Sequence, residues 1–354
     1  MSANLKQGRR VVLVALALVF GGCATSSTVG TSESDTVVST TEMSTTAAPS
    51  TTNTTAARTP ETSAAERGPG VLAGDPTQVT GRVEVGIKPC GVVGGAGRIW
   101  VSIFGSGTVR SVDPQTLELS EPISVGTSPC GVAVGADSLW VENYGSNNVT
   151  RIDLSTGKVL STIDVGSLPY DVTFFDNAAW VTDYGDGTVS RIDATTEKRT
   201  VIPVSPQPIG IVAAGGMVWV AHENGDLLGI DPTTSAVTIQ TSIGTAANWT
   251  AADGNDLWIG GRFDNDVVHL DATTAKVLDR YDIGALPLDG DVIDGVAWFP
   301  DRAGKIHELT SDPSGRVIDS GVGWPFVIAG YDGSIWAPDY AGTDLVRIDP
   351  SATP

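Results

Sequence analysis

Charged residues, aromatic residues and cysteine are all scarce in this sequence. Of its 354 residues, 18% are charged and 6% are aromatic, and cysteine occurs three times, whereas glycine occurs 42 times. The net charge of -20 argues against a nucleic-acid ligand and against anionic lipid headgroups, because both would repel the protein. This composition indicates a turn-rich β protein with a buried core rather than a disordered chain.

The apolar run at the N-terminus is too short to span a bilayer. Residues 11–20 follow three basic residues and precede Gly21-Gly22-Cys23, which is the order of a secretory signal with a small-residue cleavage site. This leader resembles that of bacterial lipoproteins, in which the cysteine after the cut carries lipid. The resemblance implies a signal peptide over residues 1–22, a lipidated Cys23, and export to the outer face of the bacterial cytoplasmic membrane. A plain cleaved signal peptide with an incidental cysteine is the alternative.

Residues 23–76 contain no aromatic side chain and are dominated by Thr, Ser, Ala and Pro. Such a segment cannot bury enough apolar surface to offset the entropy cost of ordering its backbone. We expect a flexible tether whose roughly 50 residues span on the order of 40 Å. The tether would hold a folded domain, residues 77–354, away from the membrane.

Tryptophan recurs at a regular interval. Each interval is 38 to 40 residues long and holds four short segments that are rich in β-branched or aromatic residues and bounded by Gly, Pro, Asn or Asp. A period near 40 with four strands per unit is typical of a β-propeller blade. The sequence therefore predicts an all-β fold, a seven-bladed β-propeller with four antiparallel strands per blade, in which the tryptophans pack between blades. The positions are Trp100, Trp140, Trp180, Trp219, Trp258, Trp298 and Trp336.

The third segment of most units ends in Asp, followed by Pro or a small residue and then Thr or Gly. Examples are Asp113, Asp153, Asp231 and Asp349. An Asp at the first position of a type I turn accepts backbone hydrogen bonds. We predict that these acids are turn caps and not catalysts.

The last unit lacks its fourth segment, because the chain ends at Pro354 soon after residues 344–348. Residues 79–85, followed by Gly, match the fourth segment of another unit at residues 159–165, which is also followed by Gly. We predict that residues 82–85 form the outer strand of the last blade. A blade closed by an N-terminal strand would join the two ends of the ring without a free edge.

Two cysteines occupy the same repeat position in adjacent units. Cys90 and Cys130 both lie in the phrase Pro-Cys-Gly-Val. On a ring with a radius of roughly 7 Å, neighbouring equivalent positions lie about 6 Å apart, within the usual Cα separation for a disulfide. An even pair of cysteines outside the cytoplasm is normally oxidised, so we predict a Cys90–Cys130 disulfide between blades one and two.

Two loops of each blade fall on the same face: the loop that enters the first strand, and the loop between the second and third strands. At these positions, just after the Pro of each unit and two to four residues after each Trp, the units differ more than in their strands. Residues around a shared pocket can differ, whereas residues that pack blades together must repeat. Unconstrained loop tips would vary in the same way. The predicted ligand contacts are Tyr170, Asp171, Asp183, Tyr184, His222, Trp249, Arg262, Asp289, Asp301, Asp339 and Tyr340.

The repeated phrases, such as Leu-Trp-Val at residues 139–141 and Val-Thr-Arg-Ile-Asp at residues 149–153, resemble the YVTN-type propeller repeat and the repeats of streptogramin (virginiamycin B) lyases. The resemblance covers roughly residues 78–350. It implies the propeller fold, and it is a weak guide to function, because propellers host binding, scaffolding and several chemistries.

The lyase family uses histidines and glutamates around a divalent metal in its central cleft. The chain has three histidines. The resemblance leaves His222, Glu223 and Glu142 as catalytic candidates on the predicted face. His269 and His307 fall at strand positions that should lie away from it.

Two functions stay open. The first is a non-catalytic binding, sensor or scaffold module, monomeric and without a cofactor, that takes a small molecule, a glycan or a protein at its central face. The second is a metal-dependent lyase or lactonase-like hydrolase on the same face, with a divalent metal held by carboxylates such as Asp171, Asp183, Asp289 and Asp301. The sequence has no nucleophile-and-base motif and no convincing metal motif, so the binding function leads.

Overall fold

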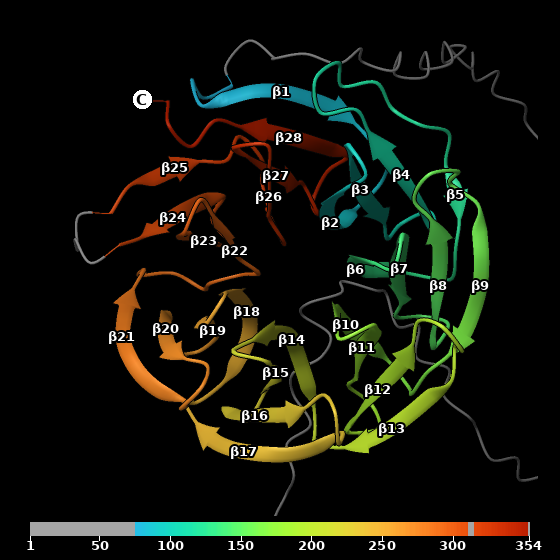
Figure 1. Cartoon of the computed structure of the whole chain (residues 1–354). Coiled ribbons are helices and arrows are strands. Elements are labelled where there is room, and N and C mark those ends of the chain that lie inside the picture. Colours follow the sequence, from blue (N-terminus) through green and yellow to red (C-terminus); the bar gives the residue numbers. More distant parts are fainter. Residues whose placement is uncertain (1–74, 311–314, 353–354) are drawn as a thin grey trace, which may run out of the picture. The chain divides into compact units, whose positions relative to one another are not determined.

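The computed structural model describes residues 75–310 and 315–352. The predicted signal peptide, Cys23 and all but the last two residues of the predicted tether lie outside this part of the chain. The described residues form 28 strands and no helix, so no membrane-spanning helix occurs among them. The strands make seven four-stranded antiparallel sheets arranged in a ring (Figure 1). The predicted seven-bladed β-propeller is confirmed.

Each blade runs from an inner strand at the centre of the ring to an outer strand at its rim (Figure 1). Blade one contains β2 (Pro89–Gly95), β3 (Arg98–Ile103), β4 (Thr108–Val112) and β5 (Ile123–Ser124). Blade two contains β6 (Pro129–Gly135), β7 (Ser138–Asn143), β8 (Asn148–Asp153) and β9 (Val159–Asp164). Blade three contains β10 (Pro169–Phe175), β11 (Ala178–Asp183), β12 (Thr188–Asp193) and β13 (Arg199–Pro203). Blade four contains β14 (Pro208–Ala214), β15 (Met217–His222), β16 (Asp226–Asp231) and β17 (Ala236–Ser242).

The remaining blades have the same order, with shorter inner strands in the last two. Blade five contains β18 (Ala247–Asp253), β19 (Asp256–Gly261), β20 (Asp266–Asp271) and β21 (Lys276–Asp282). Blade six contains β22 (Asp291–Ile293), β23 (Val296–Pro300), β24 (Lys305–Leu309) and β25 (Val317–Asp319). Blade seven contains β26 (Ala329–Tyr331), β27 (Ser334–Pro338), β28 (Asp344–Ile348) and, from the N-terminal end of the domain, β1 (Val79–Glu84).

The repeated tryptophan packs each blade against its neighbour, as predicted. Trp140 has no exposed surface and lies in one cluster with Val172 and Ile192 of blade three. Its indole N–H donates to the carbonyl oxygen of Gly135 at 3.1 Å, and the Arg151 guanidinium lies 4.8 Å from its ring centroid. The large apolar ring is therefore buried with its one polar group satisfied.

The predicted turn caps are also confirmed. Asp153 Oδ1 accepts hydrogen bonds from the backbone N–H groups of Ser155 at 3.1 Å and Thr156 at 2.8 Å. Hydrogen bonds from the hydroxyls of Ser155 and Thr156, together with these backbone hydrogen bonds, lower the pKa of Asp153 to about 2. The carboxylate therefore stays charged at any ordinary pH and holds the turn after the third strand.

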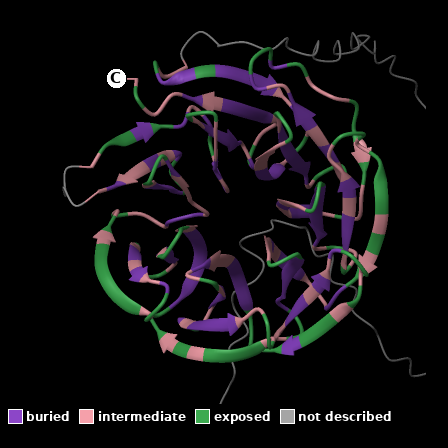
Figure 2. Ribbon diagram, in the orientation of Figure 1, coloured by how far each residue is buried: buried purple, intermediate pink, exposed green. Residues whose placement is uncertain are grey.

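The closing strand β1 is more buried than the outer strands of other blades. It pairs with β28, with Arg82 opposite Val346, so the predicted outer strand of blade seven is confirmed and begins three residues earlier, at Val79. Figure 2 shows β1 largely buried, whereas β9 and β21 are mostly exposed. Arg82 accounts for part of this difference, because it pairs with both Asp75 and Asp344.

Candidate functional site

In blades one to three, the side chain two positions after the Trp supports the inner strand. Along a β-strand, successive side chains point to opposite faces, so the direction of each side chain after Trp depends on its distance from Trp in the sequence. Thr182 Oγ1 accepts a hydrogen bond from the N–H of Asp171 at 3.0 Å, and Ser102 does the equivalent in blade one. Glu142 takes this role in blade two, where its Oε1 accepts from the N–H of Gly131 at 2.8 Å. Glu142 therefore occupies a position that serves blade structure.

Burial governs the charge of Glu142. The side chain has no exposed surface, and its Oε2 atom has no hydrogen-bond partner within residues 75–310 and 315–352. Burial raises the pKa of this carboxyl well above its usual range, and the nearby Asp171 raises it further. The neutral form is therefore favoured over the form that a general base or a metal ligand requires.

The side chains three positions after Trp lie inside the blades and do not reach the centre. Asp183 is fully buried and accepts hydrogen bonds from the N–H of Gly166 at 2.8 Å and the hydroxyl of Ser190 at 2.7 Å. His222 is its equivalent in blade four and is also fully buried, with Nδ1 3.3 Å from the carbonyl oxygen of Asp226. Burial lowers the pKa of His222, so the imidazole is neutral.

Asp301 and Asp339 share this offset and hold local structure. Asp301 accepts from the N–H of Lys305 at 2.9 Å, and its second oxygen lies 2.9 Å from Nε2 of His307. Asp339 accepts from the N–H of Trp324 at 3.1 Å and so fixes the backbone of a residue at the centre of the ring. The predicted contacts at this offset are Asp183, His222, Asp301 and Asp339. Among them, Asp339 affects the central face, because it holds the backbone of Trp324 in place.

The side chains four positions after Trp form a rim on the central face, one from each blade. Three pairs of neighbours in this rim are in contact. The rings of Phe104 and Tyr340 are 5.8 Å apart between centroids, which joins blades one and seven. The Tyr184 hydroxyl donates to Glu223 at 2.7 Å, and Glu223 pairs with Arg262 at 3.5 Å, which joins blades three, four and five. The seven residues are Phe104, Tyr144, Tyr184, Glu223, Arg262, Arg302 and Tyr340.

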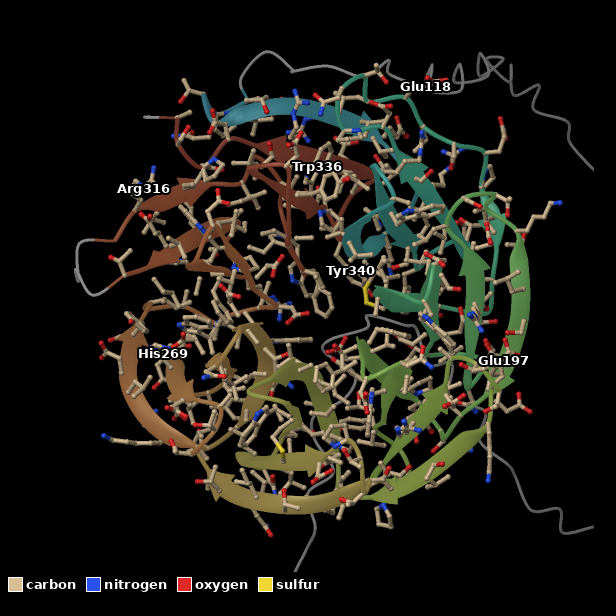
Figure 3. The ribbon with its side chains drawn as sticks, in the orientation of Figure 1. Glu118, Glu197, His269, Arg316, Trp336 and Tyr340 are labelled. Atoms are coloured by element: carbon tan, nitrogen blue, oxygen red, sulfur yellow. A yellow bond between two sulfur atoms is a disulfide. The ribbon has the colours of Figure 1, made fainter. Side chains whose placement is uncertain are left out.

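Aromatic side chains from the inner segments fill the space within this rim. Trp249 lies 5.0 Å from Phe326 and 6.0 Å from Tyr170, measured between ring centroids, and Trp324 lies 5.1 Å from Tyr340. Figure 3 places Tyr340 near the centre of the ring, whereas the repeated Trp336 lies within blade seven. The contacts are continuous, and we call the connected set the aromatic cluster. Its eight members are Phe104, Tyr144, Tyr170, Tyr184, Trp249, Trp324, Phe326 and Tyr340.

Two polar atoms of the aromatic cluster are buried and have no hydrogen-bond partner in the described part of the chain. They are Nε1 of Trp324 and the hydroxyl oxygen of Tyr340. Burial raises the pKa of Tyr340 to about 12, so the hydroxyl keeps its proton and can donate it. Buried polar groups are nearly always paired in native proteins, so these two call for a partner from outside the chain.

Two cations lie against the same rings. The Arg302 guanidinium is 4.6 Å from the ring centroid of Trp324, and the Lys88 ammonium is 5.9 Å from that of Tyr340. In a chain with a net charge of -20, they give the aromatic cluster a locally positive border. The arrangement suits a ligand with a flat apolar part and an acceptor or anionic group.

Beneath the aromatic cluster, the channel holds two of the predicted carboxylates. A small cavity of about 40 Å³ is lined by Tyr170, Trp249 and Phe326 on one side and by Asp171 and Asp289 on the other. The same two carboxylates line a wider cavity of about 290 Å³ toward the far ends of the inner strands. The aromatic cluster therefore closes the channel on its own face, and the acids face the wider cavity at the opposite end.

The two channel carboxylates link neighbouring blades. Asp171 accepts from the N–H of Ile211 in blade four at 3.0 Å, and Asp289 accepts from the N–H of Thr250 in blade five at 3.2 Å. Burial raises the pKa of Asp171 to about 6, and it raises that of Asp289 well above its usual range, where Asp171 adds to the effect. Ionisation of both carboxyls at the same time is therefore unfavourable.

The structure does not bring the three catalytic candidates together. Glu142 and His222 are enclosed within blades two and four, and Glu223 lies on the rim between Tyr184 and Arg262. No three His, Cys, Asp or Glu side chains among the described residues are grouped so that they could hold a metal ion. His269 stacks on Trp258 at 4.6 Å in the outer part of blade five (Figure 3).

Sequence reasoning missed Phe104, Lys88 and Trp324 as parts of this face. Phe104 has the same offset from its Trp as Tyr340, and Lys88 and Trp324 each directly precede the Pro of their units. Two fixed offsets, four residues after the Trp and one residue before the Pro, would have found all three residues.

The predicted disulfide is present. Cys90 and Cys130 are joined, with their Cα atoms 5.0 Å apart, at the inner ends of β2 and β6 (Figure 3). Close approach of the inner strands makes this possible, because a Cβ atom on Gly91 would lie 2.1 Å from the carbonyl oxygen of Cys130. The bridge fixes blades one and two at the edge of the small cavity.

Comparison with known proteins establishes the fold. No protein-family model matches this chain, and no curated protein matches it by sequence. A catalytically inactive variant of virginiamycin B lyase from Staphylococcus aureus, with quinupristin, has a TM-score of 0.66 at 17% identity, over 78% of this chain and 97% of that one. The Kuenenia stuttgartiensis hydrazine synthase has a TM-score of 0.66 at 14% identity, over 76% of this chain and 97% of that one. The Cps50 (Swd1) β-propeller domain of Myceliophteria thermophila has a TM-score of 0.64 at 13% identity, over 75% of this chain and 97% of that one.

These likenesses concern architecture alone. At such low identity, proteins with the same propeller carry unrelated functions, and the site decides what each one does. The streptogramin lyase-like propeller implied by the repeats is thus shown as a fold. Activity has to be argued from the aromatic cluster and its surroundings.

Proposed function

We propose that this protein is a ligand-binding module whose site is the aromatic cluster and its cationic border. The ligand class that fits is a small molecule with a flat apolar part and a hydrogen-bond acceptor or negative charge. The observation that carries the proposal is the pair of buried polar atoms on Trp324 and Tyr340 that have no hydrogen-bond partner among residues 75–310 and 315–352. A ligand acceptor that reached either group would satisfy it, and Arg302 and Lys88 would attract a negatively charged acceptor.

The break in the repeat supports the same conclusion. Every blade supplies one rim residue, yet the residues are Phe, Tyr, Glu and Arg rather than one type. Blade packing does not require this variety, because the packing Trp is the same in all seven blades. A ligand that touches each blade differently would require it.

A fragment screen by calorimetric titration tests the site. The full chain is titrated with indole-3-acetate, naphthalene-1-carboxylate and benzoate, together with the neutral alcohols of the same rings. We expect at least one carboxylate to bind, and Trp324→Ala to weaken its binding about tenfold or more. Arg302→Gln should weaken the carboxylates more than the alcohols, because it removes the charge and leaves the ring.

Phe263→Ala is the matched control. Phe263 is 62% exposed, adjoins Arg262 of the rim, and lies outside the aromatic cluster, so its removal should leave binding unchanged. The proposal fails if none of the probes binds at millimolar concentration, or if Trp324→Ala binds them as the wild type does.

We further propose that the module works outside the cytoplasm, anchored through lipid on Cys23. The leader sequence and the Thr/Ser-rich residues that follow it support this placement. Radiolabelled palmitate should be incorporated into the wild-type chain expressed in a bacterium and not into Cys23→Ala. Release of the wild type from membranes by salt alone would contradict the anchor and would leave the binding proposal intact.

A further inference from the structure

A second hollow lies between blades one and two, away from the small central cavity. It is a groove of about 680 Å³, formed by the loop that connects β3 and β4, the segment that leads into β6, and the outer half of blade two. This volume is within the usual range of about 300–1,000 Å³ for ligand pockets. Its lining is Phe104, Gly105, Ser106, Gly107, Ser124, Val125, Gly126, Thr127, Ser128, Ser146, Asn148, Thr150, Val159 and Thr162.

The groove lies where the outer strand of blade one departs from the repeat. The outer strand of blade one, β5, pairs with β4 at only two positions, whereas β13 pairs with β12 at five. In blade three, Arg199 lies opposite Ile192, and its guanidinium reaches Ser190 and the buried Asp183. In blade two the residue at this position is Val159, opposite Ile152, and its short side chain leaves the space open.

The lining has no charged residue, although the chain carries 21 basic and 41 acidic residues. Hydroxyl groups dominate it. The side-chain hydroxyls of Ser124, Thr127, Ser128 and Thr162 form no hydrogen bond with other described residues, so each can both donate to and accept from a ligand. Phe104, which is partly exposed, presents an aromatic surface at the end of the groove toward the aromatic cluster.

We infer that this groove binds an uncharged glycan. Sugar hydroxyls need partners that donate and accept in turn, and the serine and threonine hydroxyls supply them without desolvating a charge. The apolar face of a sugar ring can pack on Phe104. An extended peptide fits less well, because strand addition uses backbone groups along a strand edge, whereas this groove presents mainly side-chain hydroxyls. The inference does not depend on the function proposed for the aromatic cluster.

Calorimetric titration of the full chain with neutral pentasaccharides tests the inference. The probes are cellopentaose, maltopentaose, chitopentaose and mannopentaose, with an oligogalacturonate of the same length as the charged comparison. We expect at least one neutral probe to bind and the oligogalacturonate to bind at least about tenfold more weakly. Val159→Arg fills the groove as Arg199 fills the equivalent space in blade three, and it should weaken binding of the neutral probe about tenfold or more.

Two variants separate this site from other effects. Val201→Arg places the same charge on the outer strand of blade three, at a residue that is 50% exposed and outside the groove, and should leave glycan binding unchanged. Trp324→Ala should also leave it unchanged while binding of aromatic carboxylates falls. The inference is overturned if no neutral probe binds at millimolar concentration or if Val159→Arg binds as the wild type does. The other occupant considered is an extended peptide, represented by a synthetic peptide of residues 39–55. Binding of this peptide to the groove, with no binding of any glycan, would also overturn the inference.

Discussion

The seven tryptophans of the repeat and the two tryptophans at the centre of the ring occupy different surroundings. The repeated ones lie at one offset in every blade, are no more than 7% exposed, and pack sheet against sheet. Trp249 and Trp324 lie at positions where the other blades carry different residues, and both belong to the aromatic cluster. The chain keeps the repeat where each blade meets the next one, and departs from it where all blades surround one space.

The sharpest test of this difference removes one tryptophan from each region. Trp180→Ala should lower the free energy of unfolding by about 4–5 kcal/mol, because it leaves a cavity between blades three and four in a site with no exposed surface. Trp324→Ala should lower it by less than about 1 kcal/mol, because Trp324 is partly exposed. Denaturant unfolding of the two variants measures both values.

The comparison would fail if the two variants lost similar stability. A large loss for Trp324→Ala would mean that the aromatic cluster holds the ring together. Trp219→Ala, at the same position of the next blade, provides the matched replicate for Trp180→Ala and should give a loss of similar size.

Removal of the disulfide tests whether the structure at the centre of the ring depends on this covalent link. The bridge closes a loop with a sequence separation of 40, for which the chain-entropy estimate is about 3–4 kcal/mol. Replacing both Cys90 and Cys130 by Ser should lower the free energy of unfolding by about this amount and leave binding at Trp324 in place. Equal stability of wild type and double variant under non-reducing conditions would contradict this role.

The residues that pack the blades together and cap their turns could be predicted from the sequence, because each of them is repeated. Trp140 and Asp153 recur at equivalent positions, so their roles follow from the period alone. Closure of the ring was predictable because residues 79–85 have a counterpart in blade two. Even the disulfide follows from one repeat position occupied twice.

The candidate site was harder to predict, because it depends on which way single side chains point. Asp183 and Tyr184 are adjacent in the sequence, yet Asp183 is enclosed within blade three and Tyr184 reaches the rim. A shift of one residue along a strand reverses the face of its side chain, so a window of three positions mixes both faces. Such a window includes both His222 and Glu223, of which Glu223 reaches the rim.

Asp171 offers the finest test, because it is a variable central residue that also links two blades. Its pKa is raised to about 6 in the folded chain, against an ordinary value of 3.8, so between these values the folded state binds more protons than the unfolded state. The stability that this group contributes is present below about pH 4 and is lost as the pH rises through 6. This difference in pKa corresponds to a loss of about 3 kcal/mol for the isolated group, and coupling to Asp289 spreads the loss over a wider pH range.

Asp171→Asn should flatten this fall, because an amide cannot ionise and its oxygen can still accept from Ile211. Denaturant unfolding of wild type and variant between pH 4 and pH 7 measures the difference. Asp153→Asn is the control, because its carboxyl has a pKa of about 2 and is already ionised throughout this range in the folded chain. Parallel pH profiles for wild type and Asp171→Asn would mean that the carboxylate is solvated rather than holding blades three and four together. The residues at the centre of the ring would then serve ligand binding alone, whereas the repeated residues between blades serve packing.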